Sequence, residues 1–562
     1  MGWGYNYSGQ VGIGEAEVKG PDECYCVITP ATLLGVGNVT GLDAGYEFGL
    51  ALRSDGSMMS WGYNYEGELG DGTTTLNAVP KPIDGISNAI AVAAGSEHAL
   101  ALLADGTVLA WGSNDDGELG FGSAEGPEEC NAIPCSKRPR PVPGLSGVVA
   151  IASGEYASYA LLADGTVLGW GRDENGATGT GVSPENKCKC TPTPTAIPGV
   201  AHAVAISGGE DTAAAVLRDG TVLNWGENDH SSLGTGTATP EPGCACLGAV
   251  APAGLSNVRQ ISEGGLHSLV LADGVARGWG YNFDSQVGIG SASVESPCYC
   301  VPTATTIGGL SDARKVDAGS YHSAALLGNG TLMAWGENDL GQLGDGTQDV
   351  ERPSPVAVPG LSGASDVVAT VSNTYAIIGP SQTLSLAFAG TGSGTAGGSG
   401  ILCSAACSQP FAQGQVKALR ADPDSAGQFA GWSGAGCSGT GPCFARLDTD
   451  QTVTATFGKP KGTKITKAKI SGKKRKKAKF RFTAPGAVTG FQCLLLKPKP
   501  RKGGAKKSAK KKRKAKFAKC APGKTYKNLK PGRYTFKVRA VNILGVDAKP
   551  AKRKFKVHAP KR

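Results

Sequence analysis

Long apolar runs are missing from this 562-residue chain, since no stretch of about 18 consecutive apolar residues occurs in it. A transmembrane helix is therefore not expected. No signal segment precedes the first sequence repeat either. Charged residues are sparse at 18%, whereas glycine is abundant at 85 residues and follows no collagen-like period. Scattered glycine of this kind predicts many tight turns between short strands.

Acidic residues are almost absent from the C-terminal part. From Lys459 onward the chain has 38 lysines and arginines but a single acid, Asp547. The preceding part holds 18 basic and 46 acidic residues, so the formal net charge of +9 hides an acidic body of −28 and a basic end of +37. Such a separation of charge affects solubility and the choice of binding partners, and it does not indicate the fold.

A Trp-Gly pair recurs every 50–59 residues, which is typical of propellers and solenoids. Asn or Asp follows each tryptophan after three residues and glycine after nine, a pattern that predicts a tight turn. The tryptophans are Trp3, Trp61, Trp111, Trp170, Trp225, Trp279 and Trp335, and the glycines are Gly12, Gly70, Gly120, Gly179, Gly234, Gly288 and Gly344.

A second turn lies six residues before six of these tryptophans. It reads Asp-Gly at Asp55, Asp105, Asp164, Asp219 and Asp273, and Asn-Gly at Asn329. Such a dipeptide between apolar runs is a strong hairpin signal. With further strand-like segments upstream and no helical period, each repeat is expected to be an all-β blade of four short strands.

The stretch AGSEHALALLADGTVLAWGSNDDGELGFG resembles the repeat of the regulator of chromosome condensation family, whose units form a seven-bladed propeller. The resemblance covers residues 1–380. Within the family, the chain is similar to the bacterial secreted members. The hairpin half that belongs to Trp3 is missing upstream, but VVATVSNTYAIIG at 367–379 has its pattern. We therefore predict an all-β, seven-bladed propeller closed by the N-terminal strand against 367–379, since closure removes open sheet edges.

Three histidines occupy one repeat position, namely His98, His267 and His322. Side chains spread around a ring cannot converge on one centre, so a structural role is expected. No Ser/His/Asp set, paired-carboxylate motif or phosphate-binding loop accompanies them. The sequence therefore predicts no catalytic residue, no cofactor, no metal site and no small-molecule substrate, and the protein is not expected to be an enzyme.

The sixteen cysteines fall into eight local pairs, five of them in long loops of the repeat. Disulfides are favoured because a zinc site needs four ligands and each loop supplies two thiolates without histidine, although zinc remains the alternative. The pairs are Cys24/Cys26, Cys130/Cys135, Cys188/Cys190, Cys244/Cys246, Cys298/Cys300, Cys403/Cys407, Cys437/Cys443 and Cys493/Cys520. Eight pairs indicate an oxidising compartment outside the cytoplasm.

Two further β modules are predicted after the propeller. Residues 381–458 contain FAGWSGAGCSGTGPC and resemble the internalin B-type bacterial repeat, with Trp432 as the core anchor. Residues 459–562 are a lysine-rich linker followed by a module that resembles an immunoglobulin or fibronectin type III sandwich. Within it, the lysine-rich loop near 499–516 is expected to be disordered because its charges repel one another.

Eight basic residues crowd eleven positions of that loop, and the sequence predicts that they bind an anionic polymer. Cell-wall polymer, anionic lipid and extracellular DNA are alternatives, as is a solvated face without a ligand. No aromatic residue interleaves these lysines, so base stacking is not expected. The residues are Lys506, Lys507, Lys510, Lys511, Lys512, Arg513, Lys514 and Lys516.

The function expected from these features is a monomeric, extracellular or cell-surface scaffold whose propeller loops bind a protein while the basic module attaches to an anionic surface. The resemblance adds a precedent, because bacterial propellers of this family include secreted β-lactamase inhibitory proteins. The alternative is a cytoplasmic guanine-nucleotide exchange factor acting on a small GTPase, as in the family's eukaryotic namesake. Because the chain opens inside a repeat, we expect an export signal upstream of Met1.

Overall fold

The computed structural model describes residues 1–16, 24–181, 189–236, 245–290, 298–390, 392–423, 428–458, 464–471, 477–483, 490–497, 516–521, 523–542, 545–546 and 550–558. Within these ranges every regular element is a β-strand. The described residues include no helix that is long and apolar enough to cross a membrane. The chain forms two compact units. The first comprises Met1–Leu386, Ala396–Arg420 and Pro442–Val453, and the second comprises Ala387–Thr395, Ala421–Gly441 and Thr454–Arg562.

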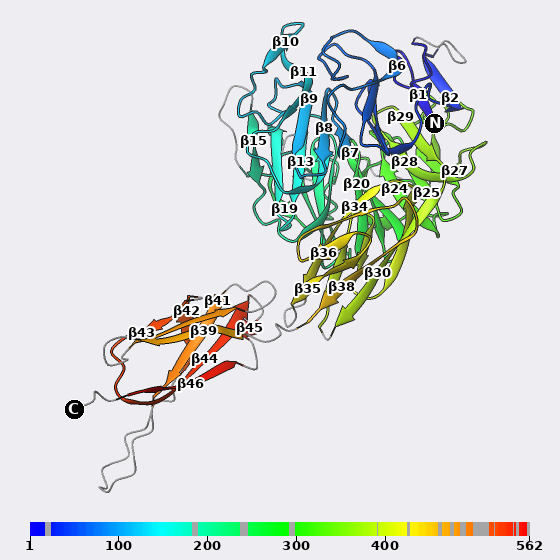
Figure 1. Ribbon diagram of the computed structural model, residues 1–562. Helices are drawn as coiled ribbons and strands as arrows, with labels where there is room; N and C mark the ends of the chain where they lie inside the picture. Colours follow the sequence, from blue (N-terminus) through cyan, green and yellow to red (C-terminus); the bar gives the residue numbers. More distant parts are fainter. Residues whose placement is uncertain are drawn as a thin grey trace. The chain divides into compact units, whose positions relative to one another are not determined.

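Seven antiparallel sheets in the described part of the first unit form the propeller, each built around one repeat tryptophan (Figure 1). The Trp61 blade contains β3 (Val39–Ala44), β4 (Phe48–Arg53), β5 (Met58–Gly62) and β6 (Asn77–Pro82). The Trp111 blade contains β7 (Ala89–Ala94), β8 (His98–Leu103), β9 (Val108–Ser113), β11 (Ile133–Pro141) and, beyond it, β10 (Glu128–Cys130). The Trp170 blade contains β12 (Val148–Ser153), β13 (Ala157–Leu162), β14 (Val167–Arg172) and β15 (Cys190–Ala196).

The remaining four blades repeat this order. The Trp225 blade contains β16 (Ala203–Gly208), β17 (Thr212–Leu217), β18 (Val222–Glu227) and β19 (Ala245–Val250). The Trp279 blade contains β20 (Val258–Glu263), β21 (His267–Ala272), β22 (Val275–Tyr281) and β23 (Cys300–Thr306). The Trp335 blade contains β24 (Ala313–Ala318), β25 (His322–Leu327), β26 (Leu332–Gly336) and β27 (Arg352–Ala357). The Trp3 blade joins β28 (Ala364–Ala369) and β29 (Asn373–Ile378) to β1 (Gly2–Tyr5) and β2 (Cys26–Ala31).

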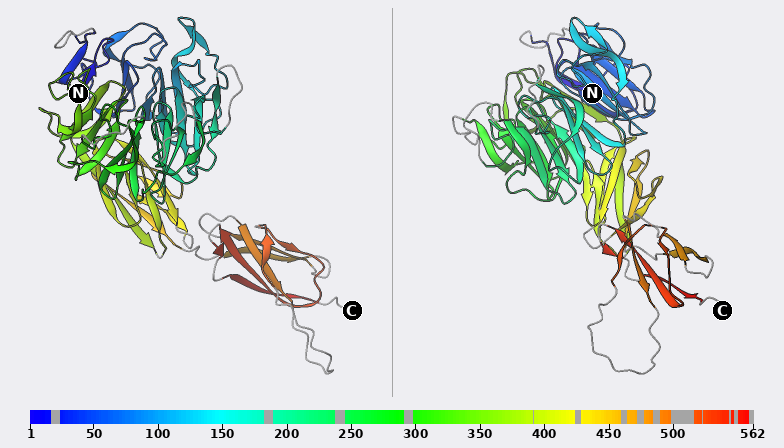
Figure 2. Two further views of the ribbon diagram at one scale, coloured as in Figure 1. Left: turned by 180° about the vertical axis from the view of Figure 1, so that it is seen from behind. Right: turned by 90° about the vertical axis from the view of Figure 1, so that its left-hand side faces the viewer.

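The predicted seam is confirmed, because β1 lies between β2 on one side and β29, from the far end of the propeller sequence, on the other. Gly2, Trp3 and Gly4 lie opposite Tyr375, Thr374 and Asn373 in antiparallel register. The Asn373 side chain adds hydrogen bonds from Nδ2 to the carbonyl oxygens of Trp3 and Tyr5, at 3.2 and 2.7 Å. Figure 2 shows the blue N-terminal strands against the green ones from behind.

Each repeat tryptophan is a joint between two blades. All seven are fully buried, and each indole Nε1 donates a hydrogen bond of 2.7–3.0 Å to a backbone oxygen in the turn of the preceding blade. The acceptors are Gln10 for Trp61, Glu68 for Trp111, Glu118 for Trp170, Ala177 for Trp225, Ser232 for Trp279, Gln286 for Trp335 and Gln342 for Trp3. A buried indole N–H needs a hydrogen-bond acceptor. The regular spacing of the tryptophans therefore reflects a contact that each of them makes with the neighbouring blade.

The glycine nine residues after each tryptophan belongs to the same joint. At Gly344 the backbone has a φ of +66°, and a Cβ atom there would lie 2.4 Å from the Nε1 atom of Trp3. Both features exclude a side chain, because a non-glycine residue is strained at this φ and has no room beside the indole. The equivalent glycines of the other six blades meet the next indole in the same way.

The first unit also contains strands from the segment that follows the propeller. These are β32 (Ile401–Cys403), β33 (Cys407–Ala412) and β37 (Cys443–Arg446), together with parts of β30 (Ser381–Gly390), β31 (Gly394–Gly398), β34 (Val416–Pro423) and β38 (Gln451–Phe457). Within this unit β30 pairs with β33, β31 with β32, and β34 with β37. Ala418 and Phe444 pack against the shared core of the Trp170 and Trp225 blades.

In the second unit, Trp432 anchors a small aromatic core as predicted. It lies on β35 (Phe429–Gly434), which pairs with β36 (Cys437–Gly439), and its ring centroid is 5.0 Å from that of Phe429.

The rest of the second unit is a sandwich of two sheets. One contains β39 (Lys464–Ser471), β40 (Lys477–Thr483) and β43 (Thr525–Tyr526), and the other contains β42 (Ala518–Cys520), β41 (Gly490–Leu496), β44 (Gly532–Asn542), β45 (Gly545–Val546) and β46 (Ala551–Val557). Their inward side chains form one core in which the rings of Phe480 and Phe536 stack with centroids 4.1 Å apart.

Candidate functional site

The side chains of the three repeat histidines form hydrogen bonds between neighbouring blades. His98, His267 and His322 contact Ser158, Ser323 and Thr374 of the next blade through Nε2, at 2.8–2.9 Å. Burial lowers the pKa of His98 and His267 to about 3 and that of His322 to about 4. These rings are therefore neutral at ordinary pH, and their hydrogen bonds hold the ring of blades together.

The two ends of the propeller differ in what covers them. The Asp-Gly hairpins lie at one end, where Arg420 donates a hydrogen bond to the carbonyl oxygen of Ala203 and Arg446 donates one to that of Ser54. Gln415 on the segment before β34 also donates to Asp366 at the axis, at 2.6 Å. The segment after the propeller thus contacts this end at three points around the ring.

The opposite end is assembled from two repeat positions. The residue two places after each tryptophan donates its backbone N–H to the carbonyl of a residue just past the glycine turn of the same blade, at 2.9–3.2 Å. The donor and acceptor pairs are Tyr5 and Ser372, Tyr63 and Glu47, Ser113 and Glu97, Arg172 and Tyr156, Glu227 and Asp211, Tyr281 and Leu266, and Glu337 and Tyr321. This bond brings both positions together around the axis.

Acids and tyrosines dominate these two positions together with the position just before the acceptor. We call the acidic, tyrosine and arginine side chains at these three positions the acidic–aromatic rim; the other seven residues there are Ser96, Ser113, Gly265, Leu266, Ser320, Val371 and Ser372. The rim consists of Tyr5, Tyr46, Glu47, Tyr63, Glu97, Glu155, Tyr156, Arg172, Glu210, Asp211, Glu227, Tyr281, Tyr321 and Glu337. Seven members are acids, six are tyrosines and one is an arginine. Tyr46 and Tyr321 are 51% and 36% exposed at the mouth of the axial cavity. A partner at this end therefore meets negative charge and aromatic rings together.

Neighbouring carboxyl groups on the rim share hydrogen bonds across blades. Glu97 is paired with Glu66, and burial followed by the charge of Glu66 raises the pKa of Glu97 to about 8. Glu210 is paired with Glu155, and the same two causes raise the pKa of Glu210 to about 7. Burial and Asp211 raise the pKa of Glu227 to about 8. The negative charge of the rim therefore increases as the pH rises through 7–8.

The cysteine loops place further side chains beside the rim. Tyr25 lies between Cys24 and Cys26, and its ring centroid is 5.1 Å from that of Tyr7, the residue four places after Trp3. Tyr299 lies between Cys298 and Cys300 and contacts Phe283 at 5.4 Å in the same way.

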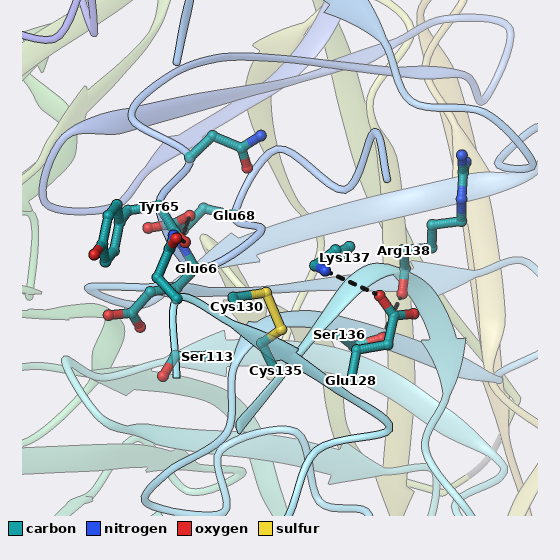
Figure 3. Close-up of a disulfide and its surroundings, with 12 residues drawn as sticks. Tyr65, Glu66, Glu68, Ser113, Glu128, Cys130, Cys135, Ser136, Lys137 and Arg138 are labelled. Carbon is teal, nitrogen blue, oxygen red and sulfur yellow. Dashed lines mark hydrogen bonds and ion pairs between the residues drawn. A yellow bond between two sulfur atoms is a disulfide. The ribbon is translucent and has the colours of Figure 1, made fainter. Parts of the chain in front are cut away.

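Other residues of these loops make equivalent contacts. Lys189 forms an ion pair with Glu174, and Asn131 donates to the Tyr65 carbonyl at 2.7 Å. Figure 3 shows Tyr65, Glu66 and Glu68 clustered on one side of the Cys130–Cys135 disulfide, with Glu128 and Lys137 on the other. The variable cysteine loops thus surround the rim with residues of different chemistry.

An axial cavity of about 490 Å³ opens at the rim. The innermost strands line it, and Lys315 of β24 lies 2.9 Å from Asp366 and 3.1 Å from Asp317. Burial alone would lower the pKa of Lys315, but these two carboxylates outweigh it and raise the pKa. Asp43 also lines the cavity, and burial raises its pKa to about 7. The cavity therefore holds its one lysine in an ion-pair network.

One group of acids in the described ranges brings three carboxylates close enough to share a cation. Ligand oxygens of Asp115, Asp116 and Glu118 lie within 4.8 Å of one another. Two of these oxygens already have partners, because Glu118 accepts from the Asp116 backbone at 3.1 Å and Asp115 accepts from the Ser113 hydroxyl at 3.1 Å. The cluster lies in the turn that follows Trp111, where Glu118 is buried and Asp115 is exposed.

The structure joins five of the predicted cysteine pairs, and three more cysteines are also disulfide-bonded. The five bonds are Cys24–Cys26, Cys130–Cys135, Cys298–Cys300, Cys403–Cys407 and Cys493–Cys520. The three further cysteines are Cys190, Cys437 and Cys443. Cys188, Cys244 and the side chain of Cys246 lie outside the described residues, as do all the predicted polymer-binding residues of the basic loop except Lys516.

Models of known families match much of the propeller. The model described as the RCC1-like domain matches residues 87–401, and two models of the regulator of chromosome condensation (RCC1) repeat match residues 55–102 and 39–68.

Two curated relatives align with parts of the chain. The E3 ubiquitin-protein ligase HERC2 of Homo sapiens is 31% identical over 371 residues, covering 63% of this chain and 7% of HERC2. The ultraviolet-B receptor UVR8 of Arabidopsis thaliana is 30% identical over 224 residues, covering 38% of this chain and 47% of UVR8. The chain thus spans less than half the length of either relative.

Solved structures support the fold assignment. Prp20p of Saccharomyces cerevisiae shares 23% identity with a TM-score of 0.57, covering 67% of this chain and 90% of Prp20p. Human WBSCR16 shares 24% identity with a TM-score of 0.57, covering 67% of this chain and 97% of WBSCR16. Identities this low establish the fold alone.

Proposed function

This chain belongs to the family of RCC1-like domains, and from that premise we propose that it is a non-enzymatic scaffold whose acidic–aromatic rim binds a basic segment of a partner protein. The observation that carries the proposal is the composition of the rim, where seven acids and six tyrosines accompany a single arginine. At the hairpin end, the segment that follows the propeller donates hydrogen bonds to Ala203 and Asp366, and for this reason we place the partner at the opposite end, on the rim.

Arginine and lysine are the side chains that this chemistry recognises. A guanidinium group forms charge-assisted hydrogen bonds with carboxylates and stacks on aromatic faces. The rim contains one such arrangement of its own, because the Arg172 guanidinium lies 5.1 Å from the centre of the Tyr156 ring. Exposed Tyr46 and Tyr321 offer rings of the same kind at the axial cavity, which Glu155 and Glu210 also line.

The binding test uses the full chain and a fluorescein-labelled nona-arginine peptide, with nona-glutamate as the negative probe. We expect fluorescence anisotropy to report binding of nona-arginine, weakening with salt. The variant Glu155→Gln/Glu210→Gln is expected to weaken binding about tenfold, whereas Asp164→Asn/Asp219→Asn, which alters the hairpin end of the same two blades, is expected to leave it unchanged. Equal losses in both variants would contradict the assignment to the rim.

The proposal has two further parts, the cellular location of the protein and the role of its basic C-terminal module. The bonded cysteine pairs support an extracytoplasmic location, of the bacterial secreted type, because such bonds persist in oxidising compartments. The basic module attaches the scaffold to an anionic surface, and the support for this is the charge of +37 from Lys459 onward. Loss of attachment at high salt, or after removal of residues 459–562, tests the second part.

A second candidate function is guanine-nucleotide exchange on a small GTPase. The observation that favours it is the likeness in fold to Prp20p, whose structure is described together with its binding properties to Gsp1p and histones. Release of a fluorescent guanine nucleotide from Gsp1p tests it directly. Faster release in the presence of this chain would support exchange, and an unchanged rate would remove it.

A further inference from the structure

We propose that the outer face of the sheet containing β41, β44 and β46 is a binding track for a linear phosphate polymer without bases. The proposal rests on the anchoring role given above to the basic module, and it locates that role on a folded sheet rather than on the lysine-rich loop of residues 499–516.

The strands β44 and β46 place like charges directly opposite each other. Arg533 lies opposite Lys556, and Lys537 lies opposite Lys552, in antiparallel register. Their neighbours Tyr534, Phe536 and Val538 point into the core, so these cations share the outer face. Like charges in such pairs destabilise a sheet, since their Cβ atoms are only about 5 Å apart.

No acid among the described residues of this sheet offsets that repulsion, because Asp547 is the single acid after Lys459. Seven cations belong to the outer face, and they continue across the neighbouring strands β41 and β42. They are Lys519, Arg533, Lys537, Arg539, Lys552, Lys554 and Lys556. An anionic ligand that covers this face relieves the repulsion.

The spacing of these cations suits a polymer with regularly repeated charge. Lys552, Lys554 and Lys556 are alternate residues of β46, so they follow one another at roughly 6.8 Å along one side of the strand. Arg533, Lys537 and Arg539 run along β44 beside them. Together they form two adjacent rows, which can neutralise successive phosphates of one extended chain.

The described part of the face offers few rings for stacking on bases. Phe517 lies there, but its ring is already in contact with the Arg539 guanidinium, 4.2 Å from the ring centre. The other described outward residues of the face on the paired strands are Gln492, Leu494, Leu496 and Thr535, none of them aromatic. Binding of single-stranded nucleic acid relies on aromatic stacking as well as on charge. The composition of the face therefore favours a phosphate polymer over single-stranded DNA.

The test uses the full chain and three variants that each remove three charges. The first, Lys552→Gln/Lys554→Gln/Lys556→Gln, neutralises a row of the track. The second, Lys467→Gln/Lys469→Gln/Lys479→Gln, neutralises the opposite sheet, where Lys469 and Lys479 also face each other. The third, Lys510→Gln/Lys511→Gln/Lys512→Gln, neutralises the loop. Binding is measured by isothermal calorimetry with inorganic polyphosphate and with poly(glycerol phosphate), at several salt concentrations.

We expect the first variant to lose at least tenfold more affinity than the other two, and the slope of log affinity against log salt to fall by about 2. Its melting temperature should stay the same or rise, because repulsion across β44 and β46 is relieved. Equal losses in the three variants, or a loss confined to the loop variant, would overturn the assignment to this face. Stronger binding of oligothymidine than of polyphosphate would overturn the choice of ligand. If the unmodified chain binds no polyanion, the anchoring function itself fails.

Discussion

Trp3 donates its indole hydrogen to the carbonyl oxygen of Gln342, 3.0 Å away and 339 residues later in the chain. The same contact recurs six times between consecutive blades, so the seam of the ring uses the joint that every other pair of blades uses. Gly344 packs against the Trp3 indole, because only a residue without a side chain fits there at a φ of +66°.

Replacing Gly344 by alanine is expected to destabilise the propeller by about 2–4 kcal/mol, through backbone strain and displacement of the indole. Gly360→Ala is the matched control, because Gly360 also has a positive φ of 74° but open space around its Cβ position. We expect it to cost about 1 kcal/mol. Urea denaturation followed by tryptophan fluorescence compares the two. Equal costs would mean that strain alone, and not the joint, explains the glycine.

The melting temperature should be highest between about pH 4.5 and 6.5. Folding raises the pKa of Glu97 and Glu227 from 4.5 to about 8, so their contribution to stability is complete below pH 4.5 and is lost as the pH rises to 8. Folding lowers the pKa of His98 and His267 from 6.5 to about 3, so their contribution is present above pH 6.5 and is lost as the pH falls. Calorimetry from pH 4 to 9 checks this, and a maximum above pH 8 would contradict it.

Affinity of the rim for nona-arginine should increase with pH. Glu97 and Glu210 lose their protons as the pH passes about 8 and 7, which adds negative charge while the peptide stays fully charged. We expect the dissociation constant measured by anisotropy to fall several-fold between pH 6 and 9 at constant ionic strength. In Glu155→Gln/Glu210→Gln this dependence should be reduced, and a dependence unchanged by the substitutions would exclude these carboxyls as its source.

Arg420→Ala is expected to loosen the segment that covers the hairpin end. The Arg420 guanidinium is buried and donates to the carbonyl oxygen of Ala203 at 2.5 Å, so its removal should cost about 1–3 kcal/mol. Limited proteolysis between residues 381 and 458 measures the loosening. Arg446→Ala is the control, because Arg446 is exposed and its loss should cost less than about 1 kcal/mol.

Thiol titration of the native protein should find no reactive cysteine among the five joined pairs. After reduction and unfolding, all sixteen cysteines should react. Zinc released by acid, together with free thiols in the native protein, would replace the disulfide interpretation with the metal alternative. Sixteen free thiols without zinc would remove the support for an extracytoplasmic location and favour the exchange-factor candidate.

The blades and the seam could be predicted from the sequence because their signals are local and repeated. The Asp-Gly or Asn-Gly hairpin before six of the tryptophans and the glycine after all seven are dictated by turn geometry, and the missing half of the Trp3 repeat pointed to residues 367–379. The structural role of the histidines followed from their equivalent positions, and each of them contacts a hydroxyl group of the next blade.

The rim and the covered end could not be predicted in the same way. Rim residues such as Tyr46 and Glu227 stand at fixed repeat positions, but the residue type at these positions differs from blade to blade, so no motif marks them as one surface. The packing of Phe444 and Ala418 on the propeller joins segments far apart in the sequence and has no periodic signal. The sequence did contain one signal for the contacts of the cysteine loops, because Cys-Tyr-Cys occurs twice. Both of these tyrosines contact the aromatic side chain that stands four residues after a repeat tryptophan.

Pairing between β1 and β29 also sets an order of events during synthesis. The first strand leaves the ribosome long before Asn373 exists, so it has no partner while about 370 residues are made. The blades between can form hairpins as they emerge, but the Trp3 blade is completed last, by contacts of very large sequence separation. Closure of the ring is therefore expected to be the slow step, and a chain interrupted before residue 373 would leave Trp3 exposed and a strand edge open to other chains.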